Sequence, residues 1–567
     1  MKQRSLTLLG SLVALAAAST AQQSSIAQQE GDIVFGTGGS IVRINKLAVT
    51  DSGILFTNCD LDGTSSSADD VILLNGFLSL PESATLALPV GAKIDKFLDM
   101  DINEKGFLGW PLEISGGGIT NSNDTGVYWN TLLLAQENGP ITATEYRGEP
   151  LPLGGPRTYN RFNVVKISNR DSVLFAGRMS IVSGTQAAIS LIETDGIGGV
   201  TGERILFLQG YPFPGTEEEV NSVGTSVNSI ALANDDSTLT QVKIGSDNSM
   251  DSVIALNDTI LAREGTPAPV PLDPESGEVR TYTDLGGTKL DLNDFGEYVY
   301  VGFANGDTNT NLFLVVNGET YIQEGENIPA FGNATLDRFD SVGMMIANSG
   351  DLYWYAKTDE SASSDQYLLR NGEVIVQENT TVIDGESITR IRSVQYGFHV
   401  SDSGRFWVAE GENGSGDEVI LFVDFGTSYP LNGCGSNPAT LVKTSGEARV
   451  GDTLELEMDG EQAVGAIPLL FLSLGSALPG NLRDTQQCGI QRPLGEIMIS
   501  LSAANLVERI PSVATDGSPV NFTLNIPNDS ALVGLQVYSQ GVYWDVAGTS
   551  GTVFQPSNGF YMEFGAP

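Results

Sequence analysis

An all-β fold is predicted by three features of this sequence: a short phrase that recurs seven times, a high glycine content, and short hydrophobic runs separated by turn residues. Glycine occupies 66 of the 567 positions, whereas an average content of about 7% would give roughly 40. With 41% hydrophobic residues the chain can still bury a core. We expect a seven-bladed β-propeller followed by a C-terminal β-sandwich.

The recurring phrase is a hydrophobic stretch, an Asn or Asp, a Gly or a substitute for it, and a second hydrophobic stretch. The turn position of this phrase is occupied in order by Gly53, Gly106, Asp171, Asp236, Gly296, Gly350 and Gly404. The intervals between these positions are 53, 65, 65, 60, 54 and 54 residues. A period of this length in a strand-rich chain is typical of stacked β units, here seven of them.

Each repeat is expected to contain four antiparallel strands. In the sixth repeat the strands fall at residues 339–347, 351–357, 366–370 and 373–378. The last two are joined by Asn371-Gly372, and Asn-Gly between apolar runs is the strongest short-range signal for a tight hairpin. The same hairpin recurs at Asn317-Gly318 and Asn75-Gly76, and in the fourth repeat Asp258 replaces the Gly. Four strands per repeat is the make-up of a propeller blade.

The seventh repeat lacks a fourth strand after residues 418–425. An unassigned apolar segment, Asp32–Gly36, precedes the first repeat. We expect this segment to complete the last blade, because pairing the two ends of the propeller leaves no open sheet edge. The propeller would then span residues 22–430.

The phrases LNDFGEYVYVGF at 292–303 and LVVNGETYIQEGENIP at 314–329 resemble the tandem N-x-x-G-x-x-A-F repeats of secreted bacterial proteins. The resemblance covers roughly residues 40–425 and implies a propeller-like fold. It supplies no catalytic residues. In the third and fourth repeats Asp171 and Asp236 depart from the glycine of the pattern.

The remaining residues, 431–567, lose the repeat and are expected to form the sandwich. Apolar segments occur at 453–457, 467–474, 497–501, 520–526, 532–538 and 542–546. The phrases CGSNPATL and SNGF resemble a C-terminal domain of planctomycete-type secreted proteins. That resemblance implies an accessory, surface or sorting role.

Residues 1–21 have the features of a signal peptide: Lys2 and Arg4, a short apolar run, and small residues before Gln22. We therefore expect a secreted or cell-surface protein, and no later stretch has the roughly 20 apolar residues of a membrane helix. The net charge of −41 disfavours nucleic acid and anionic lipid as partners. An extracellular cation, a basic partner or a glycan is expected instead.

Export permits a disulfide, which we predict between Cys434 and Cys488, with Cys59 unpaired. His399 is the only histidine, which excludes multi-histidine metal sites, and it is interpreted as a structural strand residue. Asp99, Asp101 and Asn103 resemble the start of a calcium loop. The glycine of that loop is out of place, at Gly106, so we interpret the segment as the turn of the repeat. Calcium is the one cofactor left open, and no metal or catalytic residues are assigned.

Binding is predicted at the face of the propeller that carries the second connection of each blade and the connections between blades, because these loops are long and irregular. The candidate residues are the acids of these loops: Asp60, Asp62, Asp69, Asp70, Glu217, Glu218, Glu219, Asp359, Asp365 and Asp417. The leading interpretation is an exported binding or surface-interaction protein. The alternatives are an extracellular lyase or hydrolase with carboxylates at the central channel, and a structural component of an envelope or matrix.

Overall fold

The computed structural model describes residues 24–565 apart from 36, 64–68, 152–156, 182–183, 198, 273–276, 286–288, 340–342, 393–396, 432–436, 438, 460–465, 476–489, 493–494, 503–504, 513–517 and 545–553. The described residues form strands and three single 3-10 turns, Val227–Ser229, Pro329–Phe331 and Ser530–Leu532. The prediction of an all-β protein is confirmed. Within these residues no helix has the length and apolar character needed to cross a membrane. The proposed signal peptide lies outside the described residues.

The chain divides into two compact units. The first consists of Ile26–Asp402 and Trp407–Phe422, and we call it the repeat unit. The second contains Ser403–Phe406 and Val423–Pro567 and is called the C-terminal unit.

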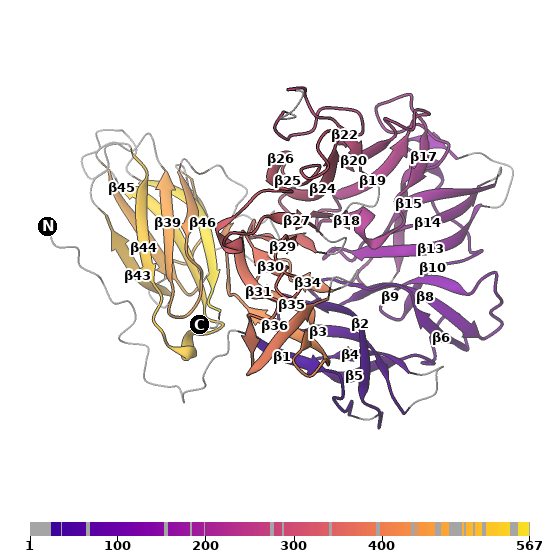
Figure 1. The fold of residues 1–567 in the computed structure, drawn as a ribbon, viewed down its shortest axis with the longest axis horizontal. Coiled ribbons are helices and arrows are strands. Elements are labelled where there is room, and N and C mark those ends of the chain that lie inside the picture. The colour runs from indigo at the N-terminus through magenta and orange to yellow at the C-terminus, as the bar shows by residue number, and fades with distance from the viewer. Residues whose placement is uncertain are drawn as a thin grey trace. The chain divides into compact units, whose positions relative to one another are not determined.

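Seven antiparallel sheets follow one another along the repeats (Figure 1), and we number them 1 to 7 in chain order. Sheet 1 contains β2 (Ile41–Val49), β3 (Leu55–Leu61), β4 (Asp70–Leu74) and β5 (Phe77–Pro81). Sheet 2 contains β6 (Ala92–Phe97), β7 (Asp101–Ile102), β8 (Leu108–Gly116), β9 (Thr125–Trp129) and β10 (Leu132–Gln136). Sheet 3 contains β13 (Arg157–Ile167), β14 (Val173–Ile181), β15 (Gly184–Thr194) and β16 (Val200–Leu208).

Sheets 4 to 6 share one pattern, in which two short segments pair with the same second strand. Sheet 4 contains β17 (Val220–Val223), β18 (Ile230–Leu232), β19 (Thr238–Ile244), β20 (Ser252–Leu256) and β21 (Thr259–Arg263). Sheet 5 contains β22 (Tyr282–Asp284), β23 (Leu290–Leu292), β24 (Tyr298–Ala304), β25 (Leu312–Val316) and β26 (Glu319–Gln323). Sheet 6 contains β27 (Leu336–Arg338), β28 (Met344–Ile346), β29 (Leu352–Thr358), β30 (Gln366–Arg370) and β31 (Glu373–Gln377).

Sheet 7 joins the two ends of the repeats. It contains β33 (Glu386–Ile391), β34 (Phe398–Val400), β35 (Phe406–Asn413) and β36 (Glu418–Asp424), with β32 (Val382–Ile383) beside β33. Its outer strand is the N-terminal β1 (Ser24–Gln29), which pairs with β36 (Figure 1).

The closing strand predicted at Asp32–Gly36 is therefore wrong in its position. Ile33 only bridges to Ser40, and the side chains of Ile33 and Phe35 are both 82% exposed. The polar segment Ser24–Gln29 can form this strand because the outer edge of a sheet buries little, so an apolar pattern is not required there. Gly36 lies outside the described residues.

The turn chemistry of the repeats matches the sequence interpretation. Asn75, Asn317 and Asn371 have φ of 49°, 51° and 51°, the left-handed values that an Asn-Gly hairpin requires. Asp171 and Asp236, which replace glycine at the main turn, also adopt positive φ, 64° and 68°. Aspartate tolerates this conformation better than most residues, so the turn is kept in the third and fourth repeats.

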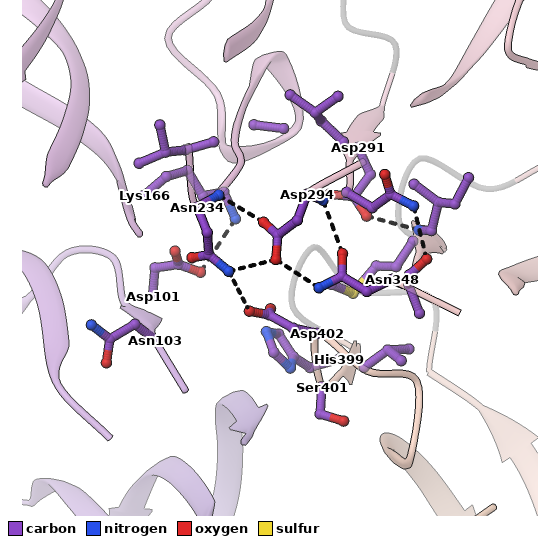
Figure 2. A pocket seen from close by; sticks show the side chains of 18 of the residues that line it. Asp101, Asn103, Lys166, Asn234, Asp291, Asp294, Asn348, His399, Ser401 and Asp402 are labelled. Atoms are coloured by element: carbon purple, nitrogen blue, oxygen red, sulfur yellow. Dashed lines mark hydrogen bonds and ion pairs between the residues drawn. The ribbon is translucent and has the colours of Figure 1, made fainter. Parts of the chain in front are cut away.

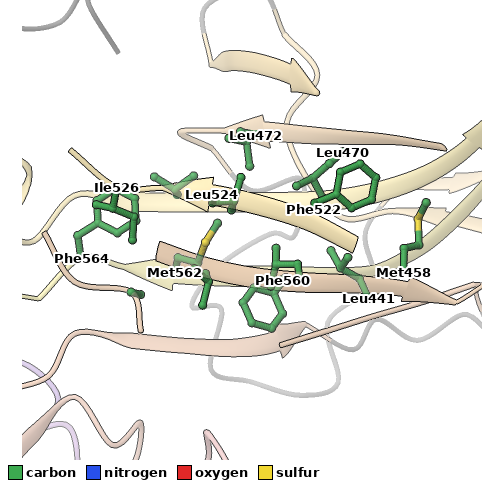
Figure 3. Packing of buried hydrophobic residues seen from close by; sticks show 14 of the residues in the cluster. Leu441, Met458, Leu470, Leu472, Phe522, Leu524, Ile526, Phe560, Met562 and Phe564 are labelled. Carbon is green, nitrogen blue, oxygen red and sulfur yellow. The ribbon is translucent and has the colours of Figure 1, made fainter. Parts of the chain in front are cut away.

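The C-terminal unit places two sheets around one core (Figure 3). The five-stranded sheet orders β37 (Thr427–Leu431), β46 (Phe554–Glu563), β45 (Gln536–Trp544), β40 (Ile467–Ser473) and β43 (Leu506–Pro511). The three-stranded sheet orders β38 (Thr440–Ser445), β39 (Thr453–Asp459) and β44 (Val520–Asn525), and β41 (Ile490–Arg492) pairs with β42 (Gly495–Ile497). Leu470 of β40, Phe560 of β46 and Phe522 of β44 are buried in the shared core.

Parts of two predicted strands of this unit, 532–538 and 542–546, belong to one continuous strand, β45, which spans Gln536–Trp544. Residues 545 and 546 lie outside the described residues. Both cysteines of the predicted disulfide, Cys434 and Cys488, lie outside the described residues. Cys59 is a free, buried cysteine in β3, and burial raises the pKa of its thiol to about 12.

Candidate functional site

Seven strands, one from each sheet, lie next to one another in a circle, and we call them the inner strands: β2, β7, β13, β18, β23, β28 and β34. β2 contacts β7, β7 contacts β13, and the contacts continue through β18, β23 and β28 in chain order. The backbone N–H of Asn348, after β28, donates to the carbonyl of Asp402, after β34, over 2.6 Å. β34 in turn contacts β2. Each sheet of the repeat unit is therefore joined to the next through its inner strand.

Each inner strand pairs with its own sheet along one edge only, so the N–H groups of its other edge need another acceptor. Side chains of the preceding sheet supply it. Asp101 accepts from Ile167 N–H at 2.9 Å, Asp291 from Ile346 N–H at 2.9 Å, and His399 Nδ1 from Val49 N–H at 3.2 Å. Asp99 accepts from Val165 N–H at 3.0 Å, and Glu418 from Ile44 N–H at 2.8 Å. The bonds of His399 and Glu418 run from sheet 7 to sheet 1.

A second set of hydrogen bonds links the turns that follow the inner strands. We call the seven residues two positions before the turn position the turn ring: Asp51, Glu104, Asn169, Asn234, Asp294, Asn348 and Asp402. Each of four side chains accepts from the backbone N–H of the preceding member, at 2.5–2.9 Å: Asn169, Asn234, Asp294 and Asn348. Glu104 accepts from the N–H of Asp51 and, at 2.8 Å, from that of Asp402.

A cavity of about 80 Å³ lies between the turn ring and the inner strands (Figure 2). We call it the central cavity. Its charged and polar lining comes from six sheets and consists of Asp101, Asn103, Lys166, Asn234, Asp291, Asn293, Asp294, Asn348, His399, Ser401 and Asp402. On its turn side the Nδ2 groups of Asn234 and Asn348 both donate to Asp294 at 2.6 Å (Figure 2). The Asp402 carboxylate also accepts from Asn234, at 3.1 Å.

The titratable groups of the cavity are held in defined charge states. Burial, with the charges of Lys166 and Lys289, lowers the pKa of His399 to about 3. The imidazole is therefore neutral at pH 7, and because Nδ1 accepts from Val49 its proton is on Nε2. Burial alone would lower the pKa of Lys166, but Asp101, at 3.4 Å, and also Asp99 and Asp291 raise it.

Two groups of the cavity region have pKa values near neutrality. Burial raises the pKa of Asp291 to about 6, despite hydrogen bonds and the charges of Lys166 and Lys289. Burial lowers the pKa of Lys289, whose Nζ lies 4.8 Å from the centre of the Phe398 ring, to about 7. A proton can therefore move onto or off either group close to pH 7.

The ten predicted acids belong to four sheets. Asp60, Asp62, Asp69 and Asp70 lie in or between β3 and β4, Glu217, Glu218 and Glu219 precede β17, Asp359 and Asp365 lie between β29 and β30, and Asp417 precedes β36. Binding by these acids stays a prediction.

Several of these acids have local partners. Glu218 forms two bonds of 2.7 Å with Arg263, and Asp365 lies 3.0 Å from Lys357. Asp62 accepts from the backbone and hydroxyl of Ser40, at 2.7 and 2.9 Å. Asp359 accepts from Thr335 N–H at 2.7 Å.

The described residues contain no group of three or more His, Cys, Asp or Glu side chains arranged to hold a metal ion. Of the segment 99–103, Asn103 begins the turn of the repeat, since its Oδ1 accepts from the N–H groups of Lys105 and Phe107 at 3.1 and 2.9 Å. Asp101 instead lies in the strand β7.

The sequence analysis did not identify Lys166, Asp291 and the turn ring. A signal was present, because the position five residues before the turn is Ala48, Asp101, Lys166, Ala231, Asp291, Met345 and His399 in the seven repeats. Three charged residues and the only histidine at one strand position of a repeat indicate a shared polar location.

No family model and no curated protein matches the chain. Among solved structures, the polysaccharide lyase Uly1 is 9% identical, with a TM-score of 0.31 over 72% of this chain and 100% of its own. Trypanosoma rangeli sialidase is 10% identical, with a TM-score of 0.28 over 95% of this chain and 93% of its own. The aldose sugar dehydrogenase of Escherichia coli is 11% identical, with a TM-score of 0.22 over 59% of this chain and 99% of its own. Similarities this weak carry no argument about activity.

Proposed function

We propose that the protein is an exported binding protein, in which the seven sheets are the blades of a β-propeller, the C-terminal unit is a β-sandwich, and the central cavity holds a small polar group of the ligand. The closed order of contacts among the inner strands supports the propeller. Export is supported by the basic start, apolar run and small residues of the first 21 positions.

One observation carries the binding proposal: the cavity is polar and its side chains are already fixed. Asp101, Asp291 and His399 are each held by a backbone N–H of the next sheet, at 2.9, 2.9 and 3.2 Å. A site whose groups do not reorganise loses little entropy when a ligand binds. Its ammonium, amide and imidazole donors lie beside carboxylate acceptors, a mixture suited to the hydroxyl groups of a sugar.

The test is a thermal-shift and calorimetric screen of the full chain with neutral monosaccharides, uronic acids and calcium chloride. We expect a sugar to bind, and Lys166→Met to weaken it about tenfold, because a hydrogen bond to a charged group contributes about 1.5–3 kcal/mol. The matched control is Lys243→Met, which removes another Lys–Asp pair, 3.0 Å from Asp251, away from the cavity. Equal binding by the two variants would contradict the proposed site.

A second function, an extracellular lyase or hydrolase, is favoured by the pKa values of Asp291 and Lys289, about 6 and 7. A carboxyl and an amine that titrate near neutrality can serve as general acid and base. We would measure new reducing ends and unsaturated products from a panel of polysaccharides. Activity that is lost in Asp291→Asn, while sugar binding persists, would favour the enzyme.

A further inference from the structure

A pair of acidic residues recurs at one end of four sheets. An Asp stands immediately before the third strand, and a Glu stands 13 positions later, immediately after the fourth strand. The pairs are Asp69 and Glu82, Asp124 and Glu137, Asp251 and Glu264, and Asp365 and Glu378. Sheet 5 has Asn311 and Glu324 at the same two positions.

The sheet register explains why the two acids meet. The backbone N–H of each Glu donates to the carbonyl of the residue that follows the Asp. Glu82 donates to Asp70, Glu137 to Thr125, Glu264 to Ser252, Glu324 to Leu312 and Glu378 to Gln366, over 2.8–3.0 Å. Both carboxyl groups of a pair are therefore brought to the same end of their sheet, the end that carries the long loops.

In sheet 6 both acids of the pair are buried. Asp365 and Glu378 are only 3% and 5% exposed. Oδ1 of Asp365, Oε2 of Glu378 and Oγ1 of Thr358 are buried and have no hydrogen-bond partner among the described residues. Lys357 Nζ lies 3.0 Å from the other oxygen of Asp365 and compensates one negative charge. Two buried carboxylates sharing one site cannot both stay ionised without a large penalty.

The other pairs differ from that of sheet 6, since Glu137 accepts from the Thr125 hydroxyl at 3.3 Å and Glu264 from Ser252 N–H at 3.4 Å. Burial raises the pKa of Glu137, and a hydrogen bond with Asp124 and the charge of Asp124 raise it further. Oε2 of Glu82 is buried without a described partner, and its pKa is raised by burial and by the charges of Asp69, Asp95 and Asp60.

In sheet 4 burial raises the pKa of Glu264, as do Asp251 and Asp284, while Lys243 lowers it. In sheet 6 burial and Asp365 raise the pKa of Glu378, against Lys357. Glu360 lies in the loop of the same sheet and accepts from the Tyr367 hydroxyl at 3.1 Å.

We propose that Asp365 and Glu378 hold one proton between their two carboxyl groups at neutral pH, and that this shared proton contributes stability that is present in mild acid and lost in mild alkali. A proton placed between Asp365 and Glu378 gives both unpartnered oxygens a partner. Sheet 5 has the uncharged Asn311 in place of the Asp, and Glu324 accepts from the N–H groups of Asn311 and Leu312 at 3.2 and 3.3 Å. Burial, with the charges of Asp337 and Asp307, still raises the pKa of Glu324.

The sign of the effect follows from linkage. A carboxyl group whose pKa is raised in the folded state contributes stability that is complete below its unfolded pKa, about 4.3 for Glu. That stability is lost as the pH rises through the folded pKa. Each unit by which folding raises the pKa corresponds to about a tenfold loss in the folding equilibrium constant.

The experiment measures the unfolding temperature of the full chain from about pH 5 to about pH 8, for wild type and Glu378→Gln. The Gln amide donates to Asp365 as the shared proton would. We therefore expect Glu378→Gln to raise the unfolding temperature at pH 8 by about 1–2 °C and to leave it unchanged at pH 5.

The matched control is Glu373→Gln, which removes the charge of an exposed residue of the same strand, β31. Equal effects of Glu378→Gln and Glu373→Gln at pH 8 would overturn the proposal, because general charge repulsion would then explain the pH dependence. Asp365→Asn, which copies sheet 5, should act like Glu378→Gln and serves if that variant fails to fold.

Two further measurements compare the wild type with Glu378→Gln. The infrared C=O stretch of protonated carboxyl groups at pH 7 should be weaker in Glu378→Gln than in the wild type, and equal intensity would contradict the shared proton. EDTA should leave the unfolding temperature at pH 8 unchanged. A decrease with EDTA that is lost in Glu378→Gln would mean that Asp365 and Glu378 hold a metal ion, which also overturns the proposal.

Discussion

The two ends of the sheets in the repeat unit use polar residues differently. At the turn end, side chains of one sheet accept hydrogen bonds from the backbone of a neighbouring sheet, as Asp101 does from Ile167 of the next sheet and Asn234 from Asn169 of the preceding one. At the loop end, the acids pair within their own sheet, as Asp365 and Glu378 do. The turn end therefore holds the sheets together, whereas the loop end accumulates negative charge.

This difference explains why one position of the repeat carries a similar residue in all seven repeats. The turn-ring residues are all Asp, Asn or Glu, the side chains that can reach and accept from a neighbouring backbone N–H. A recurring Asn or Asp in this chain is thus first a connection between sheets. A position that varies in type between repeats is the better indicator of a binding site. Five residues before the turn, Lys166 and Asp291 stand where other repeats have Ala48, Ala231 and Met345.

The largest effect is expected at Glu104, the turn-ring residue that accepts from two backbone N–H groups, of Asp51 and Asp402. Glu104→Ala should lower the free energy of unfolding by about 2–4 kcal/mol, because each unsatisfied donor costs about 1–3 kcal/mol. Glu104→Gln keeps one of the two acceptor oxygens and should cost about half of that. Denaturant unfolding of both variants decides the point, and equal losses would contradict the accepting role of Glu104.

A smaller effect is expected at His399, and it depends on pH. The folded pKa of about 3 lies below the unfolded value of about 6.5, so His399 contributes stability that is present above pH 6.5 and lost as the pH falls towards 3. His399→Gln should therefore reduce the loss of unfolding free energy in this interval. Stability curves that run parallel for the variant and the wild type would show that the imidazole is not held neutral.

Little change in stability is expected when the loop acids Asp60, Asp62, Asp69 and Asp70 are replaced together by Asn. If these acids bind calcium or a basic partner, the replacement weakens that binding, and rising salt weakens it in the wild type. Asp51→Asn, at the turn end and outside the lining of the central cavity, should mainly lower stability. Titration with calcium chloride at two salt concentrations provides the measurement, and binding lost only in the turn-end variant would reverse the assignment of faces.

The smallest effect is expected at Cys59. Its thiol is buried, and burial raises its pKa to about 12, so it holds almost no thiolate at pH 7. Iodoacetamide should leave Cys59 unmodified in the folded protein and alkylate it after denaturation, as mass spectrometry can show. Rapid alkylation under native conditions would mean that sheet 1 opens readily.

Local patterns were sufficient to predict much of the fold. Asn371-Gly372 predicts its hairpin because positive φ restricts the residues that fit, and the seven turns fix where each sheet begins. The closing strand could not be predicted, because Ser24–Gln29 buries little and has no apolar period, whereas the apolar Ile33 and Phe35 are exposed. In the C-terminal unit the continuous strand β45 contains Gly541, and a glycine between two apolar segments is typical of a turn.

The central cavity was harder to predict than the fold. Lys166, Asp291 and His399 are separated by more than 100 residues and meet only because the inner strands close in a circle. Their position relative to the turn is the only sequence signal they share. The acids of the loops were conspicuous in the sequence because they are numerous, yet the structure leaves them on four separate sheets.

The most direct test of this account is amide hydrogen exchange at Val49, Ile167 and Ile346, the inner-strand N–H groups that donate to His399, Asp101 and Asp291. Side-chain hydrogen bonds between sheets predict slow exchange at all three amides. Asp101→Ala should accelerate exchange at the Ile167 amide far more than at the amides of Val49 or Ile346. Exchange at these three amides as fast as in an exposed sheet edge would contradict the claim that side chains of one sheet hold the next.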